Sequence, residues 1–377
     1  MVRTDGFTST RDARRSGDIV ATTMPAKAAA GTQDTQRSWH AVMQQLELAP
    51  TLLSAYDWRI KDVQQHRNVA HIVTADGNYA LKRTHISPQR VQFLHNVLRY
   101  LSKRGFTNVA HFALTKKRRP YAVREGVTYY ATEWMDGQTA NFASTTHIAR
   151  VAHALARFHH QSRGFETDGY HPPTEFQFTA MMRRRTRDLR LLLEEAEKTS
   201  DPDAFDDLLV SMAANLRKDA DKSLELASDS ECQAYLTEEA HHPGLCHLDV
   251  IPGNFIYTGE HEVVLLDLDL CAYAPRVLDL AHLLRRSLQQ NRWSTDMAYL
   301  CFLQYNAVQP MTEPEYVLVR SLLTFPYRAW RLAQTRYRTF TESSQTEELQ
   351  LCADQEERRQ VFLQAFSQQI KSLRSSR

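Results

Sequence analysis

Residues 247–269, HLDVIPGNFIYTGEHEVVLLDLD, decide the fold of this chain. The pattern predicts a short loop, a strand, a turn at Gly259 and a second, apolar strand that ends at Asp267. A Pro-Gly pair bends the loop, so we expect Asp249 and Asn254 to converge on one small volume. Two carboxylates and an amide oxygen are hard ligands, the kind that Mg²⁺ takes together with phosphate oxygens. The stretch therefore predicts a magnesium and phosphate site.

A loop Asp, a loop Asn and a strand-end Asp in this order match the pattern of kinases. The alternative is an ordinary hairpin with a surface Asp and a turn Asn. The stretch resembles the active-site segment of the aminoglycoside phosphotransferase/choline kinase branch of the protein-kinase-like fold, and within it CotS-type spore coat proteins. The resemblance implies that Asp249 is the catalytic Asp and that Asn254 and Asp267 bind magnesium. His247 would hold the catalytic loop in place, and Leu248 stands where many antibiotic kinases have glycine.

The resemblance implies an α+β class, a bilobal protein-kinase-like fold with a small antiparallel-sheet N-lobe and a mostly helical C-lobe. We expect residues 1–38 to be a disordered tail, because they nearly lack large apolar side chains. Four Asp residues there argue against a targeting peptide. Residues 39–135 are the expected nucleotide-binding N-lobe. Residues 136–377 are the expected C-lobe, with the catalytic loop and the substrate pocket.

A hairpin signal around Gly77 precedes a predicted strand that carries Lys82. Lys82 is either one exposed lysine among 46 basic residues or, as the resemblance implies, the lysine that reaches the nucleotide phosphates. Two departures from kinases stand out. Residues 65–71, where a glycine-rich phosphate loop would lie, contain no glycine, and residues 77–124 contain no Asp or Glu. The usual helix carboxylate is therefore absent, and we expect Lys82 to be held by Asp267 or by nucleotide alone.

Residues 127–135, VTYYATEWM, predict a strand followed by an Asp-Gly turn. On sequence alone this is only a strand and a turn. By the resemblance, Glu133, Trp134 and Met135 form the hinge between the lobes, and their backbone binds the adenine edge.

The second half of the chain has helical spacing. His159 and His160 end one predicted helix; because adjacent residues point apart and no third ligand is expected nearby, we expect them to pack or cap instead of binding metal. The Arg-rich run at residues 183–187 is expected to be a solvated helix face, with an anionic substrate or partner as the alternative. Asp279 lies near the start of a later helix, where the dipole favours it, and the resemblance implies that it braces the catalytic loop.

The composition of the chain argues against a nucleic-acid-binding, a disulfide-bonded or a membrane-spanning protein. A net charge of +2 gives no global field for nucleic acid. The basic run at residues 116–119 is expected to cap a solvated hairpin, with nucleic-acid contact as the alternative. Five scattered cysteines without C-x-x-C spacing indicate reduced thiols. No apolar run reaches membrane-spanning length. We expect a cytoplasmic protein without membrane or nucleic-acid partners; the resemblance adds the spore coat as a location and other coat proteins as partners.

The leading hypothesis is a phosphotransferase that uses ATP and Mg²⁺ to phosphorylate a small-molecule hydroxyl. Asp269 is expected either to support this site or to face solvent. The rival hypothesis is a kinase-shaped structural protein of the spore coat with weak or no catalysis, which the missing glycine loop and helix carboxylate favour. The joint presence of Asp249, Asn254, Asp267 and Lys82 favours the enzyme, because a scaffold has no physical need for that set.

Overall fold

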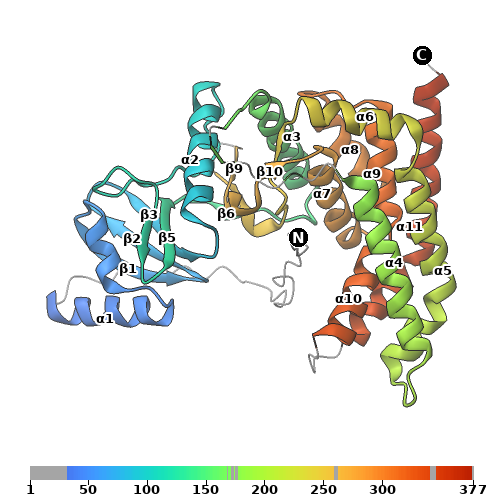
Figure 1. The fold of residues 1–377 in the computed structure, drawn as a ribbon, viewed down its shortest axis with the longest axis horizontal. Coiled ribbons are helices and arrows are strands. Elements are labelled where there is room, and N and C mark those ends of the chain that lie inside the picture. Colours follow the sequence, from blue (N-terminus) through green and yellow to red (C-terminus); the bar gives the residue numbers. More distant parts are fainter. Residues whose placement is uncertain are drawn as a thin grey trace.

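A computed structural model describes residues 32–167, 169, 170, 174, 177–258, 262–339 and 345–375. Two lobes are visible, a small one built on a sheet and a larger helical one (Figure 1). Most of the predicted disordered tail lies outside the described residues, and its last residues, 32–38, belong to helix α1 (Thr32–Gln45). The predicted turn at Gly259 also lies outside the described residues.

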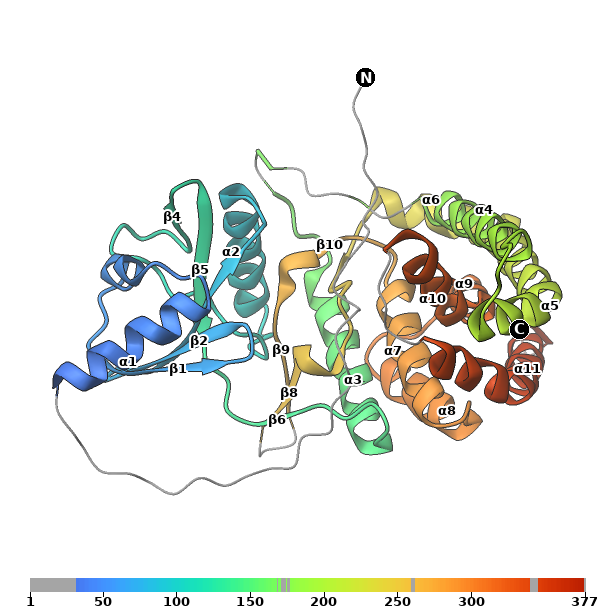
Figure 2. The same ribbon diagram turned by 90° about the horizontal axis from the view of Figure 1, so that it is seen from below.

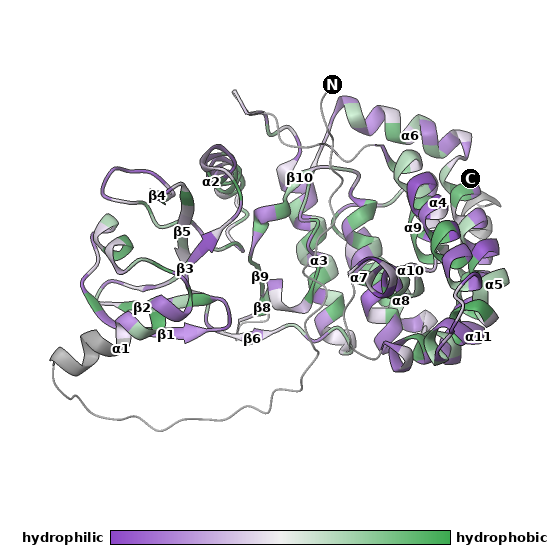
Figure 3. Cartoon of the chain, turned by 60° about the horizontal axis from the view of Figure 1, so that its bottom comes forward, coloured by the Kyte–Doolittle hydropathy of each residue, from purple (hydrophilic) through white to green (hydrophobic). Residues whose placement is uncertain are grey.

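The small lobe contains a five-stranded antiparallel sheet in the order β1-β2-β3-β5-β4. Hydrophilic residues dominate the edge strand β1 (Figure 3), which suits an edge that must not pair with another chain. In the β3–β5 pair, Lys82 lies directly opposite Tyr130. The strands are β1 (Ile60–His66), β2 (Val69–Thr74), β3 (Asn78–Thr84), β4 (Ala122–Arg124) and β5 (Val127–Glu133).

The helices of the small lobe join two different cores. Helix α1 and the 3-10 helix η1 (Pro50–Ala55) join one face of the sheet in a small cluster that includes Met43, Leu52 and Leu81. Helix α2 (Pro88–Lys103) instead packs its buried side chains into the core of the large lobe. The helix that follows Lys82 in the chain is therefore anchored to the large lobe.

The segment that leaves β5 is fixed by one glycine. Gly137 has φ +150°, and a Cβ there would lie 2.2 Å from the carbonyl oxygen of Tyr257, so only glycine fits. The chain then forms β6 (Gln138–Thr139), which pairs with β8 (Phe255–Tyr257). Strand β8 pairs with β9 (Val263–Leu265), and these strands lie between the two lobes in Figure 2. The two predicted strands are thus present, and they adjoin the other lobe.

The large lobe is a helical bundle, with the long pair α4 and α5 along its outer side (Figure 1). Helix α7 is buried along most of its length, because its apolar residues recur at helical spacing on several sides. No helix of the described residues is long and apolar enough to cross a membrane. The helices are α3 (Thr145–Ser162), α4 (Phe178–Glu197), α5 (Ala204–Ala227), α6 (Ser230–His241), α7 (Val277–Gln290), α8 (Thr295–Asn306), α9 (Glu313–Thr324), α10 (Tyr327–Arg338) and α11 (Thr346–Ser375).

Candidate active site

The predicted catalytic loop follows the short strand β7 (Leu245–Cys246) and ends in the 3-10 turn η2 (Pro252–Asn254). Asn254 Nδ2 donates to the carbonyl oxygen of Asp249 and to its carboxylate Oδ2, each at 2.9 Å. The two side chains therefore converge as the sequence predicted. Because these bonds use the amide nitrogen of Asn254, its amide oxygen is the atom that can bind a cation.

His247 is fully buried and ties the loop to the end of β9. Its Nδ1 accepts the backbone N–H of Asp249 at 3.3 Å, so its Nε2 carries the proton and donates to the carbonyl oxygen of Leu266 at 2.8 Å. Leu248 has φ +64°, a left-handed conformation that glycine adopts without strain and leucine does not. The loop thus holds a strained backbone beside Asp249, which the surrounding contacts must stabilise.

Those contacts come from Asp279 in the first turn of α7. Its Oδ2 accepts the backbone N–H of His247 at 2.6 Å, and its Oδ1 accepts that of Leu248 at 2.8 Å. His159 Nε2 lies 2.9 Å from Oδ2, and His159 Nδ1 lies 2.7 Å from the hydroxyl of Tyr305. Burial alone would raise the pKa of Asp279, but these hydrogen bonds and the nearby His159 and His247 outweigh it, so its pKa is lowered. The carboxylate therefore stays charged while it anchors the loop.

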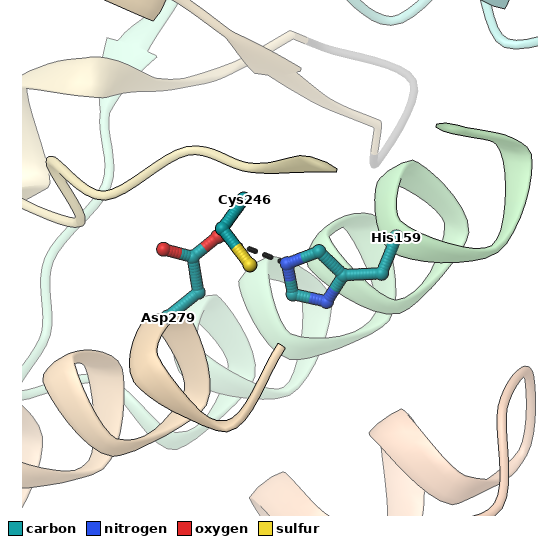
Figure 4. A group of neighbouring side chains, drawn as sticks. All are labelled: His159, Cys246 and Asp279. Carbon is teal, nitrogen blue, oxygen red and sulfur yellow. Dashed lines mark hydrogen bonds and ion pairs between the residues drawn. The ribbon is translucent and has the colours of Figure 1, made fainter. Parts of the chain in front are cut away.

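His159, Cys246 and Asp279 also lie close enough to hold a metal ion (Figure 4). The expectation that no third ligand lies near His159 is thus wrong, because α7 and β7 bring two distant residues to it. The expectation that His159 packs is confirmed by its burial and its bonds. Burial raises the pKa of the Cys246 thiol well above its ordinary value, and the thiol donates to the carbonyl oxygen of Ala274 at 3.2 Å. All three groups already serve in hydrogen bonds, so we interpret the cluster as a structural brace.

Lys82 crosses from the small lobe to two carboxylates of the large lobe. Its Nζ lies 2.7 Å from Asp267 Oδ1 and 3.2 Å from Asp269 Oδ2. Burial would lower the pKa of Lys82, but the charges of Asp269 and Asp267 outweigh that effect and raise its pKa. The expected contact with Asp267 is present, and the contact with Asp269 is an addition. Asp267 itself has φ +53°, a left-handed residue that begins the turn η3 (Leu268–Leu270).

A two-residue turn replaces the glycine-rich loop between β1 and β2. His66 pairs directly with Val69, and Arg67 takes the left-handed conformation at φ +53°. The guanidinium of Arg67 lies beside the catalytic loop, since a Cβ on Gly253 would be 3.2 Å from Arg67 Nη1. Sequence reasoning missed this residue, because nothing in the glycine-free segment shows that one of its side chains crosses to the other lobe.

The predicted hinge residues continue the sheet for one position beyond β5. The N–H of Glu133 donates to the carbonyl oxygen of His111 at 2.8 Å, and that of Trp134 to Asn78 at 2.9 Å. These two amides are thus engaged within the sheet, which leaves Met135 as the first hinge position past the ladder. The Trp134 indole stacks on the His71 ring with centroids 3.9 Å apart.

Comparison with known proteins places this site in a family. The model of the phosphotransferase enzyme family matches residues 59–304, which is most of the chain. The chain therefore belongs to the phosphotransferase enzyme family. It is also similar to spore coat protein S of Bacillus subtilis, with 22% identity over 343 residues that cover 88% of this chain and 97% of the relative. The predicted resemblance to CotS-type proteins within this superfamily is confirmed.

Solved structures agree with the fold. An aminoglycoside phosphotransferase from Alicyclobacillus acidocaldarius is 41% identical, with a TM-score of 0.81 over 86% of this chain and 97% of that one. A spectinomycin phosphotransferase in complex with ADP and spectinomycin is 13% identical, with a TM-score of 0.57 over 85% of this chain and 93% of that one, and shows the fold alone. The predicted α+β, protein-kinase-like fold is confirmed.

Proposed function

We propose that this chain transfers the γ-phosphoryl group of ATP, with Mg²⁺, to a hydroxyl of a small molecule. Membership in the phosphotransferase enzyme family supports the reaction class. The strongest support for the proposal is the hydrogen-bonded pair of Asp249 and Asn254, which lies on a loop anchored to Asp279. Phosphoryl transfer needs mainly positioning and charge neutralisation, and a loop of this kind supplies the first.

The donor atoms fit a magnesium ion. Asp267 offers a carboxylate, and Asn254 has its amide oxygen available because the nitrogen serves Asp249. Carboxylate and amide oxygens are the protein ligands that Mg²⁺ prefers, together with phosphates. Asn254 and Asp267 would hold the ion, and the bound ion would neutralise charge on the phosphate oxygens.

The roles of the side chains follow from their positions. Asp249 would accept the proton of the acceptor hydroxyl. The oxygen of that hydroxyl would bond to the γ-phosphorus while the bond from the γ-phosphorus to the leaving ADP oxygen breaks. Lys82 would bind the phosphates, and Arg67 would add a second cation from the β1–β2 turn. His247 would act as a positioning residue, because it touches Asp249 only through the backbone.

The nucleotide and the acceptor would occupy different lobes. Glu133, Trp134 and Met135 would line the adenine end, with the N–H of Met135 as the hinge donor. Residues 39–135 would then form the nucleotide-binding lobe and residues 136–377 the lobe with the catalytic loop and acceptor pocket. Aminoglycosides are the first acceptor class to test, because the solved structure with 41% identity is of an aminoglycoside phosphotransferase. The similarity to spore coat protein S supports a location in the spore coat and partners there.

The variant Asp249→Asn tests the proposal. Without a general base, turnover should fall by at least ~100-fold, measured as ADP released from Mg-ATP in the presence of an aminoglycoside panel. Asp296→Asn, an exposed acid on α8, is the matched control and should keep full activity. Turnover that survives in Asp249→Asn would overturn the assignment of the base.

A second candidate function is a structural protein of the spore coat that retains the kinase shape. The glycine-free turn at Arg67 and the similarity to spore coat protein S favour it. A thermal-shift titration separates the two, since a ligand that binds the folded state raises the melting temperature. The enzyme should show a rise with millimolar Mg-ATP, whereas the scaffold should show none.

A further inference from the structure

The partner of Lys82 is the least expected feature of the site. Helix α2 and its flanking segments contain no Asp or Glu from residue 77 to residue 124. Among the described residues, the two carboxylates within ion-pair distance of Lys82 both come from the large lobe, Asp267 at 2.7 Å and Asp269 at 3.2 Å. The lysine is thus paired without any help from the helix that follows it.

Asp269 is itself held by the small lobe. Its Oδ1 accepts the hydroxyl of Tyr130 at 2.5 Å, and its Oδ2 accepts that of Thr84 at 3.2 Å. Thr84 lies two positions after Lys82 on β3, and Tyr130 lies opposite Lys82 on β5. These bonds fix the carboxylate next to the lysine, and its side chain is only 14% exposed.

Helix α2 contributes an arginine to the same arrangement. Arg90, in the first turn of α2, donates from Nε to the carbonyl oxygen of Asp269 at 2.9 Å and from Nη2 to that of Cys271 at 3.0 Å. The helix therefore positions the backbone that carries Asp269 instead of contacting Lys82 directly.

The two carboxylates differ in what they can do when ligands bind. In the proposed function Asp267 turns its oxygens to the cation, so it cannot remain the main partner of Lys82. Asp269 keeps its hydroxyl donors and stays beside the lysine. We propose that Asp269 is the carboxylate that positions Lys82 for the nucleotide phosphates, in place of a helix carboxylate; this role rests on the proposed function.

The first test is nucleotide binding by Asp269→Asn, measured by calorimetry with Mg-AMP-PNP. Loss of the carboxylate should weaken binding by roughly tenfold, as expected when a charge-assisted hydrogen bond is lost. Adenosine, which has no phosphates, should bind with unchanged affinity. Asp296→Asn is again the matched control, and Asp269→Glu should recover part of the loss.

Magnesium dependence separates positioning from metal binding. If Asp269 positions Lys82, the variant should lose a smaller factor for AMP-PNP in EDTA than with Mg²⁺, because without the cation Asp267 stays beside Lys82. The affinity for Mg²⁺ at saturating AMP-PNP should be unchanged; a roughly tenfold weaker affinity for Mg²⁺ would mean that Asp269 is a metal ligand and that the proposal is wrong. Tyr130→Phe, which removes one hydrogen bond to Asp269, should cause a smaller loss in the same direction and serves if Asp269→Asn does not fold.

A measurement on the ligand-free protein keeps the two proposals distinct. Acylation of Lys82 by an amine-reactive ester, quantified by mass spectrometry relative to exposed Lys103, should rise several-fold in Asp269→Asn, because the amine loses one of its two carboxylate partners. An unchanged labelling rate would overturn the role of Asp269. If the wild type binds no nucleotide, the proposed function fails, and the labelling alone still decides whether Asp269 holds Lys82.

Discussion

The two sides of the site, the catalytic loop of the large lobe and the lysine of the small lobe, are built in different ways. The side chain of Asp279, on which the loop rests, is 0% exposed, and that of its partner His159 is 2% exposed. On the other side Lys82 is 16% exposed, and its partner Asp267 is 31% exposed. The loop is thus part of the core, whereas the lysine and its two carboxylates are only partly buried.

The difference shows which parts of the site are complete before ligands bind. The loop needs no ligand, because Asp279 already satisfies the backbone N–H groups of His247 and Leu248. Groups that are oriented before the reaction cost no reorganisation during it. The lysine side must exchange partners, since Asp267 serves Lys82 in the ligand-free protein and would serve a cation in the complex. One side is therefore preorganised, and the other adapts.

The largest effect that tests this comparison is expected for Asp279→Ala. The substitution leaves three buried donors without an acceptor, the two backbone N–H groups of the loop and His159 Nε2. At about 1–3 kcal/mol each, the free energy of unfolding should fall by at least ~3 kcal/mol, measured by urea denaturation. Asp296→Ala, at an exposed position, should change it by less than ~0.5 kcal/mol. A loss below ~1 kcal/mol in Asp279→Ala would mean that the loop does not depend on the core.

The same division explains how far the sequence could predict the site. Asp249 and Asn254 are five positions apart on a bent loop, so their convergence is local and could be predicted. Asp267 was one of the two expected partners of Lys82, with nucleotide alone as the other, because residues 77–124 contain no carboxylate. The two lobes were implied by the family resemblance, whereas the two strands after the loop were readable from their hydrophobic pattern.

The missed contacts join segments far apart in the chain. Tyr130 reaches Asp269 across 139 positions, and His159 reaches Asp279 across 120. Periodicity shows which face of an element is buried but not which distant side chain it meets. The hydroxyl donors to Asp269 and the crossing of Arg67 to Gly253 depend on the lobe arrangement, which no local pattern encodes.

A smaller effect is expected on acidification, from His282 on α7 of the large lobe. Burial, followed by the charges of Arg285, Arg185 and Arg286, lowers the pKa of His282 to about 3, against a weaker opposite effect of Asp279. The unfolded chain takes up the proton near pH 6.5, so between pH 6.5 and about 3 it binds more protons than the folded protein. The contribution of this group therefore makes stability fall as the pH drops through that window.

The variant His282→Gln removes this proton uptake. Between pH 6.5 and pH 5 the wild type should lose ~1–2 kcal/mol more of its free energy of unfolding than the variant. The upper limit corresponds to ~1.4 kcal/mol per pH unit, and the loss should stay below that limit because His282 is partly exposed. The measurement is urea denaturation at both pH values. His160→Gln, at an exposed position of α3, should follow the wild type. Parallel pH curves for His282→Gln and wild type would show that the core around α7 does not exclude the proton.

The smallest effect on stability is expected on the lysine side, in Lys82→Met. Methionine keeps the aliphatic length of the lysine side chain. Asp267 remains in contact with water, and Asp269 keeps its hydrogen bonds from Tyr130 and Thr84. Ion pairs that solvent can reach contribute little to folding, so the free energy of unfolding should change by less than ~1 kcal/mol in urea, as in the exposed control Lys103→Met. Nucleotide binding should nevertheless be lost in Lys82→Met alone. A loss of stability as large as that of Asp279→Ala would mean that the two sides of the site are anchored alike, and that the lysine is a structural link between the lobes before it is a phosphate ligand.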